Sequence, residues 1–149
     1  MRKLALPAIA AGTCTLILAA SSLAAPQKTS WTAALSSGQE VPKQVVKNTA
    51  AHGLFKGTVS GGKLKWRLTF AKLTGSATAA HIHTGAKGKS GNVLIPLCAP
   101  CHSGVSGTAT LSATALNDFK KHLLYVNVHT AKNPAGEIRG PARARLSIR

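Results

Sequence analysis

A strictly alternating segment near the middle of the chain constrains the fold more than any other feature. Residues 63–70 read KLKWRLTF, with polar and apolar side chains in turn. Because successive side chains of a β-strand point to opposite faces, one face of this segment is apolar and the other is basic. Phe55 and Val59 precede it at strand spacing, and Gly61-Gly62 can form a tight turn between them. The sequence therefore predicts a β-hairpin with one buried face, as in an antiparallel sheet.

Other short segments with strand character follow along the chain, separated by glycine, proline, serine and asparagine. One helix is predicted over residues 113–122, because Ser112 can cap it and Leu116 and Phe119 lie on one face. The further expected strands cover residues 31–35, 77–83, 92–97, 105–111, 123–129 and 136–145. This pattern predicts an all-β fold, namely a Greek-key, immunoglobulin-like antiparallel β-sandwich with one short helix.

The N-terminal segment has the features of a secretory signal peptide. Arg2 and Lys3 precede a largely apolar stretch without charge, and small residues suited to cleavage follow it. We expect residues 1–24 to be removed, which leaves residues 25–149 as a single domain in the periplasm or outside the cell. A membrane anchor is the less favoured alternative, and we expect no membrane span in the mature chain.

The mature chain contains very few acidic residues. It carries 17 Lys and Arg against three acids, a net charge of +14. Calcium and magnesium sites and paired-carboxylate hydrolases are therefore disfavoured, because each needs several carboxylates. The positive charge should instead attract anionic lipid or polysaccharide of the cell envelope, with Lys63, Lys65 and Arg67 as the candidate surface. Nucleic acid is a disfavoured partner, because the few aromatic residues fall mostly at apolar core positions.

Three segments, in the same order, resemble those of a known protein family. They are GQEVP at 38–42, LTGSATAAHIHTG at 73–85, and YVNVHT at 125–130, which Asn133 and GEIRG at 136–140 follow. Together they resemble the CHRD domain, the module named after chordin that also occurs singly in exported bacterial proteins. The resemblance implies a β-sandwich, and the family's recurring polar positions fall on Glu40, His81, His83, His129 and Glu137. A fainter likeness to the copper/zinc superoxide dismutase sandwich is an analogy only.

Two histidines of the second segment stand at alternate positions of a predicted strand. His81 and His83 therefore share one face, about 6.6 Å apart along the strand. His129 ends another predicted strand. If the two strands are neighbours, three neutral imidazoles can converge on one ion. Such a set suits Cu(II) or Zn(II), and copper binds more tightly by the usual order of affinities.

Polar residues near these histidines could support a bound ion from a second layer. Glu40 or Glu137 could accept the second N–H of a ligand ring and so orient it. Asn127 lies on the same strand face as His129. The alternative is a buried polar cluster without a metal, in which the same side chains hydrogen-bond to one another.

Cys98 and Cys101 form a Cys-x-x-Cys-His sequence with His102, which is formally the attachment pattern of a c-type haem. Haem is disfavoured, because no methionine remains after signal cleavage to serve as the second axial ligand. The two cysteines are the only ones of the mature, exported chain, and we expect them to form a disulfide. The family resemblance implies a similar cysteine pair in this loop. Free thiols, or a metal site with His102, remain as alternatives.

The sequence leaves three classes of function open. We expect an exported CHRD-domain module of the cell envelope, with a binding or structural role and a copper or zinc site. The enzymatic alternative is a dismutase-like copper oxidoreductase, for which no fourth, bridging histidine is recognisable. No motif of a nucleophilic hydrolase or a nucleotide enzyme is present either. The third class is a protein that binds anionic lipid or polysaccharide.

Overall fold

The computed structural model describes residues 27–43 and 48–146, so the expected signal peptide at residues 1–24 lies outside the described residues. The strands are β1 (Thr29–Ser36), β2 (His52–Ser60), β3 (Lys63–Ala71), β4 (Ala77–Thr84), β5 (Val93–Cys98), β6 (Ser106–Thr110), β7 (Leu124–Thr130), β8 (Ile138–Pro141) and β9 (Arg143–Leu146). The helices are the short 3-10 turn η1 (Ser37–Gln39) and α1 (Ala113–Lys120). Neither helix has the length or apolar character needed to cross a membrane, among the residues described.

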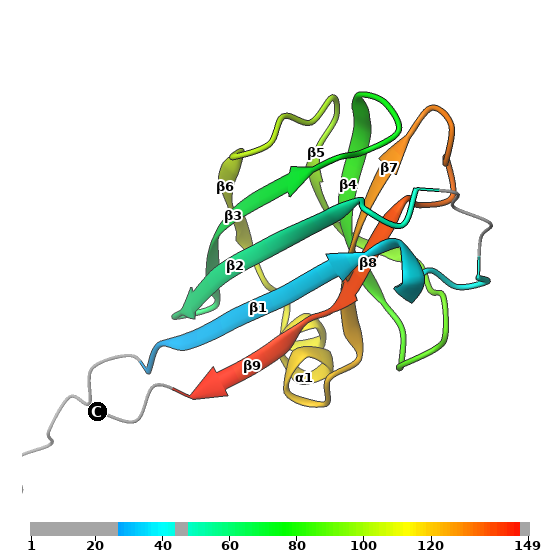
Figure 1. The fold of residues 1–149 in the computed structure, drawn as a ribbon. Helices are drawn as coiled ribbons and strands as arrows, with labels where there is room; N and C mark the ends of the chain where they lie inside the picture. The colour runs from blue at the N-terminus through cyan, green and yellow to red at the C-terminus, as the bar shows by residue number, and fades with distance from the viewer. Residues whose placement is uncertain (1–26, 44–47, 147–149) are drawn as a thin grey trace, which may run out of the picture.

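The strands form one antiparallel sheet in the order β5-β4-β7-β8-β1-β2-β3-β6, with β9 paired to β1. Figure 1 shows this sheet curling over, so that β1, β2 and β3 lie across from β4, β5 and β7. The result is a nearly closed, barrel-like domain with one short α-helix. The prediction of an all-β antiparallel fold is confirmed. The expected sandwich takes the form of a single continuous sheet, because β8 joins the two layers by pairing with both β7 and β1.

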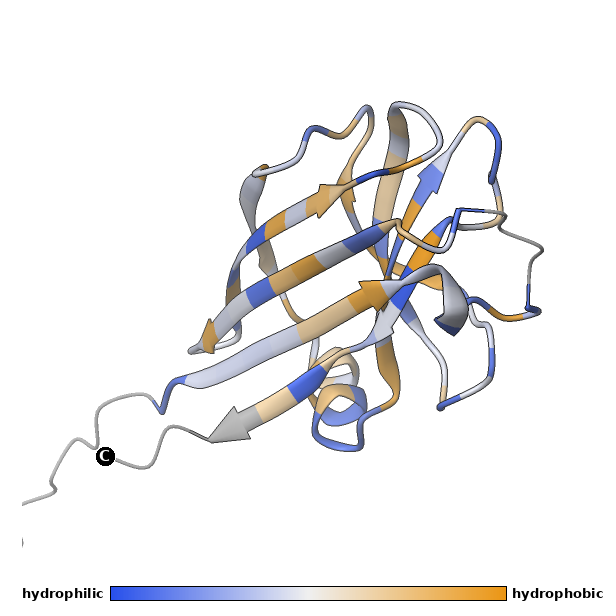
Figure 2. Ribbon diagram, viewed as in Figure 1, coloured by the Kyte–Doolittle hydropathy of each residue, from blue (hydrophilic) through white to orange (hydrophobic). Residues whose placement is uncertain are grey.

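The hairpin predicted from the alternating segment is formed by β2 and β3. Leu64, Trp66 and Leu68 are buried, whereas the residues between them are exposed. The alternating bands on β2 and β3 in Figure 2 follow the same pattern. Gly61 and Gly62 make the turn with φ of 55° and 75°, values that glycine adopts without strain.

Helix α1 closes one end of the domain over the aromatic part of the core. The Ser112 hydroxyl accepts a hydrogen bond from the Ala115 N–H at 3.1 Å, which caps the helix as predicted. Phe119 packs on Trp31 of β1 with ring centroids 3.9 Å apart, and Trp31 is fully buried. Burying side chains of this size is the main source of stability in a domain as small as this one.

The segment expected to form one strand over residues 136–145 is split into β8 and β9. Between them, the N–H of Ala142 donates to the Leu124 carbonyl at 2.9 Å. Strand β8 pairs mainly with β7, whereas β9 pairs with the opposite end of β1. The break therefore lets one chain segment serve both layers of the sheet.

The strands β4, β7 and β8 carry polar side chains on the face that points away from the core. Ile82 and Val126 pair on the core side and are fully buried. On the other side His81 pairs with Asn127, which in turn pairs with Arg139. All residues of β7 are nevertheless buried. Buried side chains on both faces of this strand give the domain a second, polar interior beside its hydrophobic core.

Candidate metal centre

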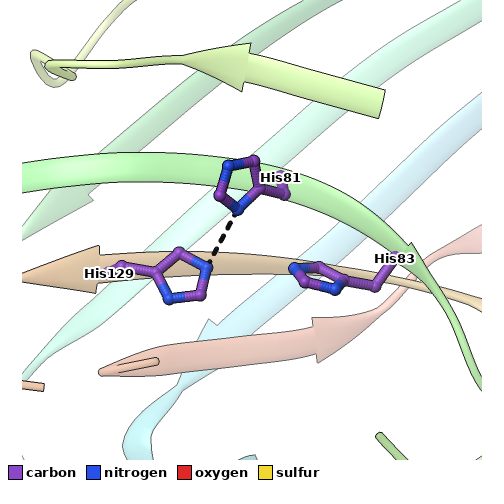
Figure 3. Close-up of side chains that lie close together, drawn as sticks. All are labelled: His81, His83 and His129. Atoms are coloured by element: carbon purple, nitrogen blue, oxygen red, sulfur yellow. Dashed lines mark hydrogen bonds between the residues drawn. The ribbon is translucent and has the colours of Figure 1, made fainter. Parts of the chain in front are cut away.

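Three histidines meet on the outer face of β4 and β7. His81 and His83 project from β4, and His129 projects from β7 toward them (Figure 3). One ring nitrogen from each of the three side chains lies within 4.8 Å of the other two. His83 and His129 are each 8% exposed, and His81 is half-buried. The pairing of β4 with β7 thus brings together the three histidines singled out in the sequence, as a group that could hold a metal ion.

Main-chain carbonyls determine which ring nitrogen of each buried histidine is free. Nδ1 of His83 lies 3.1 Å from the carbonyl of Gly91, and Nδ1 of His129 lies 3.0 Å from that of Pro134. Since a carbonyl can only accept a hydrogen bond, each Nδ1 carries the proton and each Nε2 keeps its lone pair. In the described part of the chain, Nε2 of His83 is buried without any hydrogen-bond partner. A buried, unpartnered lone pair is costly for a protein unless something binds there.

Burial keeps these imidazoles in the form that a metal requires. Desolvation lowers the pKa of His81, His83 and His129 below the ordinary value of 6.5. The carbonyls of Gly91 and Pro134 act in the opposite direction but more weakly. The three rings are therefore neutral at pH 7, and neutral imidazole is the metal-binding form.

Glu40 and Asn127 form a second polar group beside the histidines. Asn127 Nδ2 donates to Glu40 Oε2 at 3.4 Å, and Glu40 is only 3% exposed. Burial raises the pKa of Glu40 to about 7, although the positive charge of Arg139 and the Asn127 hydrogen bond oppose this rise. Glu40 is thus a buried carboxyl group that changes its charge near neutral pH.

Tyr125 connects this polar group to the histidines, a role that the sequence did not indicate. Its ring stacks on the His83 imidazole with centroids 4.8 Å apart and planes within 7°. The Arg139 guanidinium carbon lies 3.4 Å from the centre of the same ring. Because β7 lies between β4 and β8, His83 and Arg139 flank the tyrosine from two sides. The stack holds His83 in place and favours a cation at Arg139.

Glu137 has a structural environment that is distinct from that of Glu40. It is fully buried and accepts hydrogen bonds from the hydroxyls of Thr130 and Thr74, the Thr74 N–H and Asn133 Nδ2, at 2.6 to 3.1 Å. Burial opposes its charge, but these hydrogen bonds outweigh burial and hold the pKa of Glu137 below its usual range. Glu137 therefore ties the loop after β3 to the loop after β7.

Main-chain carbonyls accept the hydrogen bonds that the ring N–H groups of His83 and His129 donate. Among the described contacts, neither Glu40 nor Glu137 accepts a hydrogen bond from a histidine ring, which differs from the arrangement expected for them. Carbonyl acceptors could not be recognised in the sequence, because every residue carries one. Backbone carbonyls orient metal-ligating histidines as well as carboxylates do.

Cys98 and Cys101 form a disulfide, with Cα atoms 5.2 Å apart. The Cys101 N–H donates to the carbonyl of Ala77 at 3.1 Å, which docks the bridged loop on the start of β4. Both sulfur atoms are committed to this bond, so neither can form a thioether to haem or bind a metal. His102 is exposed and lies outside the group of three histidines.

The candidate anion-binding residues Lys63, Lys65 and Arg67 lie side by side on the exposed face of β3. Lys56 of β2 pairs directly with Arg67 and is also exposed. The sequence alone did not indicate this fourth residue, since its place beside Arg67 depends on the register of the hairpin. We call these four residues the basic stripe.

The fold and the site define an antiparallel, barrel-like β domain with a three-histidine group that could hold a metal ion. Residues 31–141 match a protein family described as the CHRD domain. Because this match covers most of the sequence, the chain belongs to the CHRD domain family, which confirms the resemblance seen in its motifs. No curated protein and no solved structure matches the chain.

Proposed function

We propose that this protein is an exported module of the cell envelope that binds a copper or zinc ion through His81, His83 and His129. The observation that supports the proposal best is the buried Nε2 of His83, which has no hydrogen-bond partner among the residues that the structure describes. His83 belongs to a group in which one ring nitrogen from each side chain lies within 4.8 Å of the other two. Two of the three rings are already oriented by carbonyls, so little ordering is needed when an ion binds.

The chemistry of the donors favours copper or zinc over other ions. Imidazole nitrogen suits both metals, whereas calcium and magnesium prefer oxygen ligands. An ion bound at about 2.0–2.1 Å from each nitrogen needs the rings to close in slightly. His81 is the natural residue to move, because it is half-buried and, within the described part of the chain, its ring is held by the contact with His129 and by no carbonyl. Three ligands leave a further coordination position free for water or another donor.

Export is proposed from the N-terminal sequence and agrees with one further feature, the disulfide. Residues 1–24 have the charge and hydropathy of a signal peptide. The Cys98–Cys101 disulfide is a bond that persists in oxidising compartments. A periplasmic or extracellular place would also expose the histidines to metal ions from outside the cell.

A metal titration tests the proposal. The mature, oxidised protein is titrated with Cu(II) and with Zn(II) by calorimetry, beside a His83→Ala/His129→Ala variant. A His102→Ala variant is the matched control, because His102 is exposed and outside the cluster. We expect one ion per chain in the parent and in the control, and at least a hundredfold weaker binding in the double variant. Equal binding by all three proteins would overturn the proposal.

The dismutase-like oxidoreductase is the enzymatic alternative, and the same sample can test it. A copper-loaded enzyme should consume superoxide far faster than the equivalent amount of the His83→Ala/His129→Ala variant with copper. A binding module should hold copper without such a difference. This comparison separates turnover from binding.

Binding to an anionic surface is a second candidate function, which the position of Lys56 in the basic stripe favours. Four exposed positive charges on two paired strands can contact a flat anionic surface together. Vesicles containing phosphatidylglycerol should bind the parent at low salt, and binding should fall steeply as salt rises. A Lys65→Gln/Arg67→Gln variant should bind more weakly than a Lys120→Gln/Lys121→Gln variant, which removes the same charge from the C-terminal end of α1. Equal binding by the two variants would rule out the stripe as the contact.

A further inference from the structure

A cavity of about 750 Å³ is lined in part by Tyr125, the residue whose ring stacks on His83 of the three-histidine group. Its volume lies within the usual size range of small-molecule sites. Nearly half of the residues that line it are glycine or small apolar residues, namely Gly38, Val41, Gly85, Ala86, Gly88, Pro141 and Ala142. The wall thus offers both apolar surface and polar side chains that could recognise a ligand.

The first of these is Arg139, which lines the cavity beside Tyr125. Its guanidinium packs over the tyrosine ring and donates one hydrogen bond to the Lys89 carbonyl. Arg139 is only 5% exposed, so its charge is fixed in place and largely shielded from bulk water. A guanidinium held in this way is a strong and directional partner for a carboxylate.

The second is Glu40, which also lines the cavity. Its Oε2 accepts the hydrogen bond from Asn127, whereas its Oε1 is buried and has no partner in the described part of the chain. A carboxyl oxygen that is buried without a hydrogen bond costs free energy in the empty cavity. A ligand with an O–H or N–H group could satisfy it.

The exposed charged side chains around the opening are all positive. Lys43, Lys87 and Arg143 are exposed and line the cavity, as His122 does. Apart from Glu40, the described lining contains no acidic residue. The rim should therefore raise the local concentration of anions and speed their entry.

We infer that this cavity is a binding site for a small organic carboxylate with an apolar body and a hydroxyl or N–H group. The carboxylate would pair with Arg139, the apolar body would lie along the small residues of the wall, and the donor would reach Glu40 Oε1. This site is independent of the three histidines, because its polar contacts come from other side chains. Ligand binding in the cavity can therefore be tested independently of metal binding.

Three simple aromatic compounds test the inference. 4-Hydroxybenzoate carries both polar groups, benzoate lacks the hydroxyl, and 4-hydroxybenzyl alcohol lacks the carboxylate. Each is titrated into the metal-free mature protein and followed by the shifts of backbone amide signals in ¹⁵N-labelled protein. We expect 4-hydroxybenzoate to bind most tightly, and the alcohol at least tenfold more weakly. The shifted signals should cluster at Gly85, Tyr125 and Arg139.

Two variants test the buried positive charge and the exposed positive charges of the cavity separately. Arg139→Met keeps the apolar stem and should weaken 4-hydroxybenzoate at least tenfold, without affecting the alcohol. Lys87→Gln/Arg143→Gln lies on exposed rim positions, cannot disturb the core, and should weaken both carboxylates severalfold. Binding of all three compounds with equal affinity, or shifts spread away from the cavity, would overturn the inference. So would the absence of any shift at millimolar concentration in the folded parent.

Discussion

Nδ1 of His81 lies 3.1 Å from Nε2 of His129, across the pair formed by β4 and β7. Because Nδ1 of His129 donates to the Pro134 carbonyl, its Nε2 has no proton and must accept. His81 therefore donates to His129 when no metal is bound. An ion at Nε2 of His129 has to replace this hydrogen bond, so the His81–His129 contact and metal binding exclude each other.

Metal affinity should fall on acidification. The fall should begin at a lower pH than in a site whose histidines have an ordinary pKa. Burial lowers the pKa of His81, His83 and His129 below 6.5, and a protonated ring cannot bind an ion. We expect the zinc affinity to stay constant as the pH falls from about 8 to about 6.5, and to decrease below that. Calorimetric titrations with zinc at a series of pH values measure this change in affinity. An affinity that already falls between pH 8 and 7 would contradict the prediction.

Replacing Gly91 should weaken metal binding although its side chain is not a ligand. A Cβ at this position would overlap the Thr84 carbonyl, so the main chain must shift. The shift would move the Gly91 carbonyl, which holds Nδ1 of His83. We expect Gly91→Ala to lose about tenfold in zinc affinity, in line with the effect of other supporting contacts. Gly75→Ala is the control, since nothing lies within 4 Å of a Cβ there, and it should bind like the parent.

Glu40 should make stability depend on pH near neutrality. Its pKa is about 7 in the folded protein, against 4.5 ordinarily, so folding favours the protonated form. Its contribution is complete below pH 4.5 and is lost as the pH rises through 7. Glu40→Gln is neutral at every pH and should gain stability relative to the parent as the pH rises, by about 3 kcal/mol at most. Urea unfolding of both proteins at about pH 5 and pH 8 measures this difference, and a constant difference would contradict the prediction.

Glu137→Gln should destabilise the protein strongly, despite its small change in shape. The carboxylate oxygens of Glu137 accept all four of these hydrogen bonds. A glutamine has an amide nitrogen in place of one oxygen, and its N–H groups would point at N–H or O–H donors instead of accepting from them. We expect a loss of about 3 kcal/mol in the free energy of unfolding. Asp118→Asn removes an acid from α1 and should change stability by less than about 0.5 kcal/mol. A similar loss in both variants would show that the hydrogen bonds are not its source.

Removing the disulfide should have a small effect on stability and none on the metal centre. A bridge between Cys98 and Cys101 closes a very short loop, and the chain-entropy model gives about 2 kcal/mol for it. Cys98→Ser/Cys101→Ser should lose that amount in urea unfolding. Its copper affinity should equal that of the parent, because the ligands are histidines. A loss of copper binding with the fold intact would mean that the cysteines take part in the site.

Much of this protein could be predicted from the sequence because the relevant signals are local. Alternation over residues 63–70 was sufficient for β3 and for its exposed and buried faces. The spacing of His81 and His83 placed them on one face, since alternation of side chains is a property of any strand. Ser112 and the apolar spacing after it indicated α1. Each of these depends on residues within a few positions of one another.

Only the tertiary structure decided what lies beside these elements. The pairing of β4 with β7 brings His129 to His81, and the register of β2 and β3 brings Lys56 to Arg67. The carbonyls that hold the histidine rings come from loops, and no side-chain pattern distinguishes them. Pairing between distant segments is selected by the burial and hydrogen bonding of the whole chain together, and a local sequence pattern carries no information about its partner.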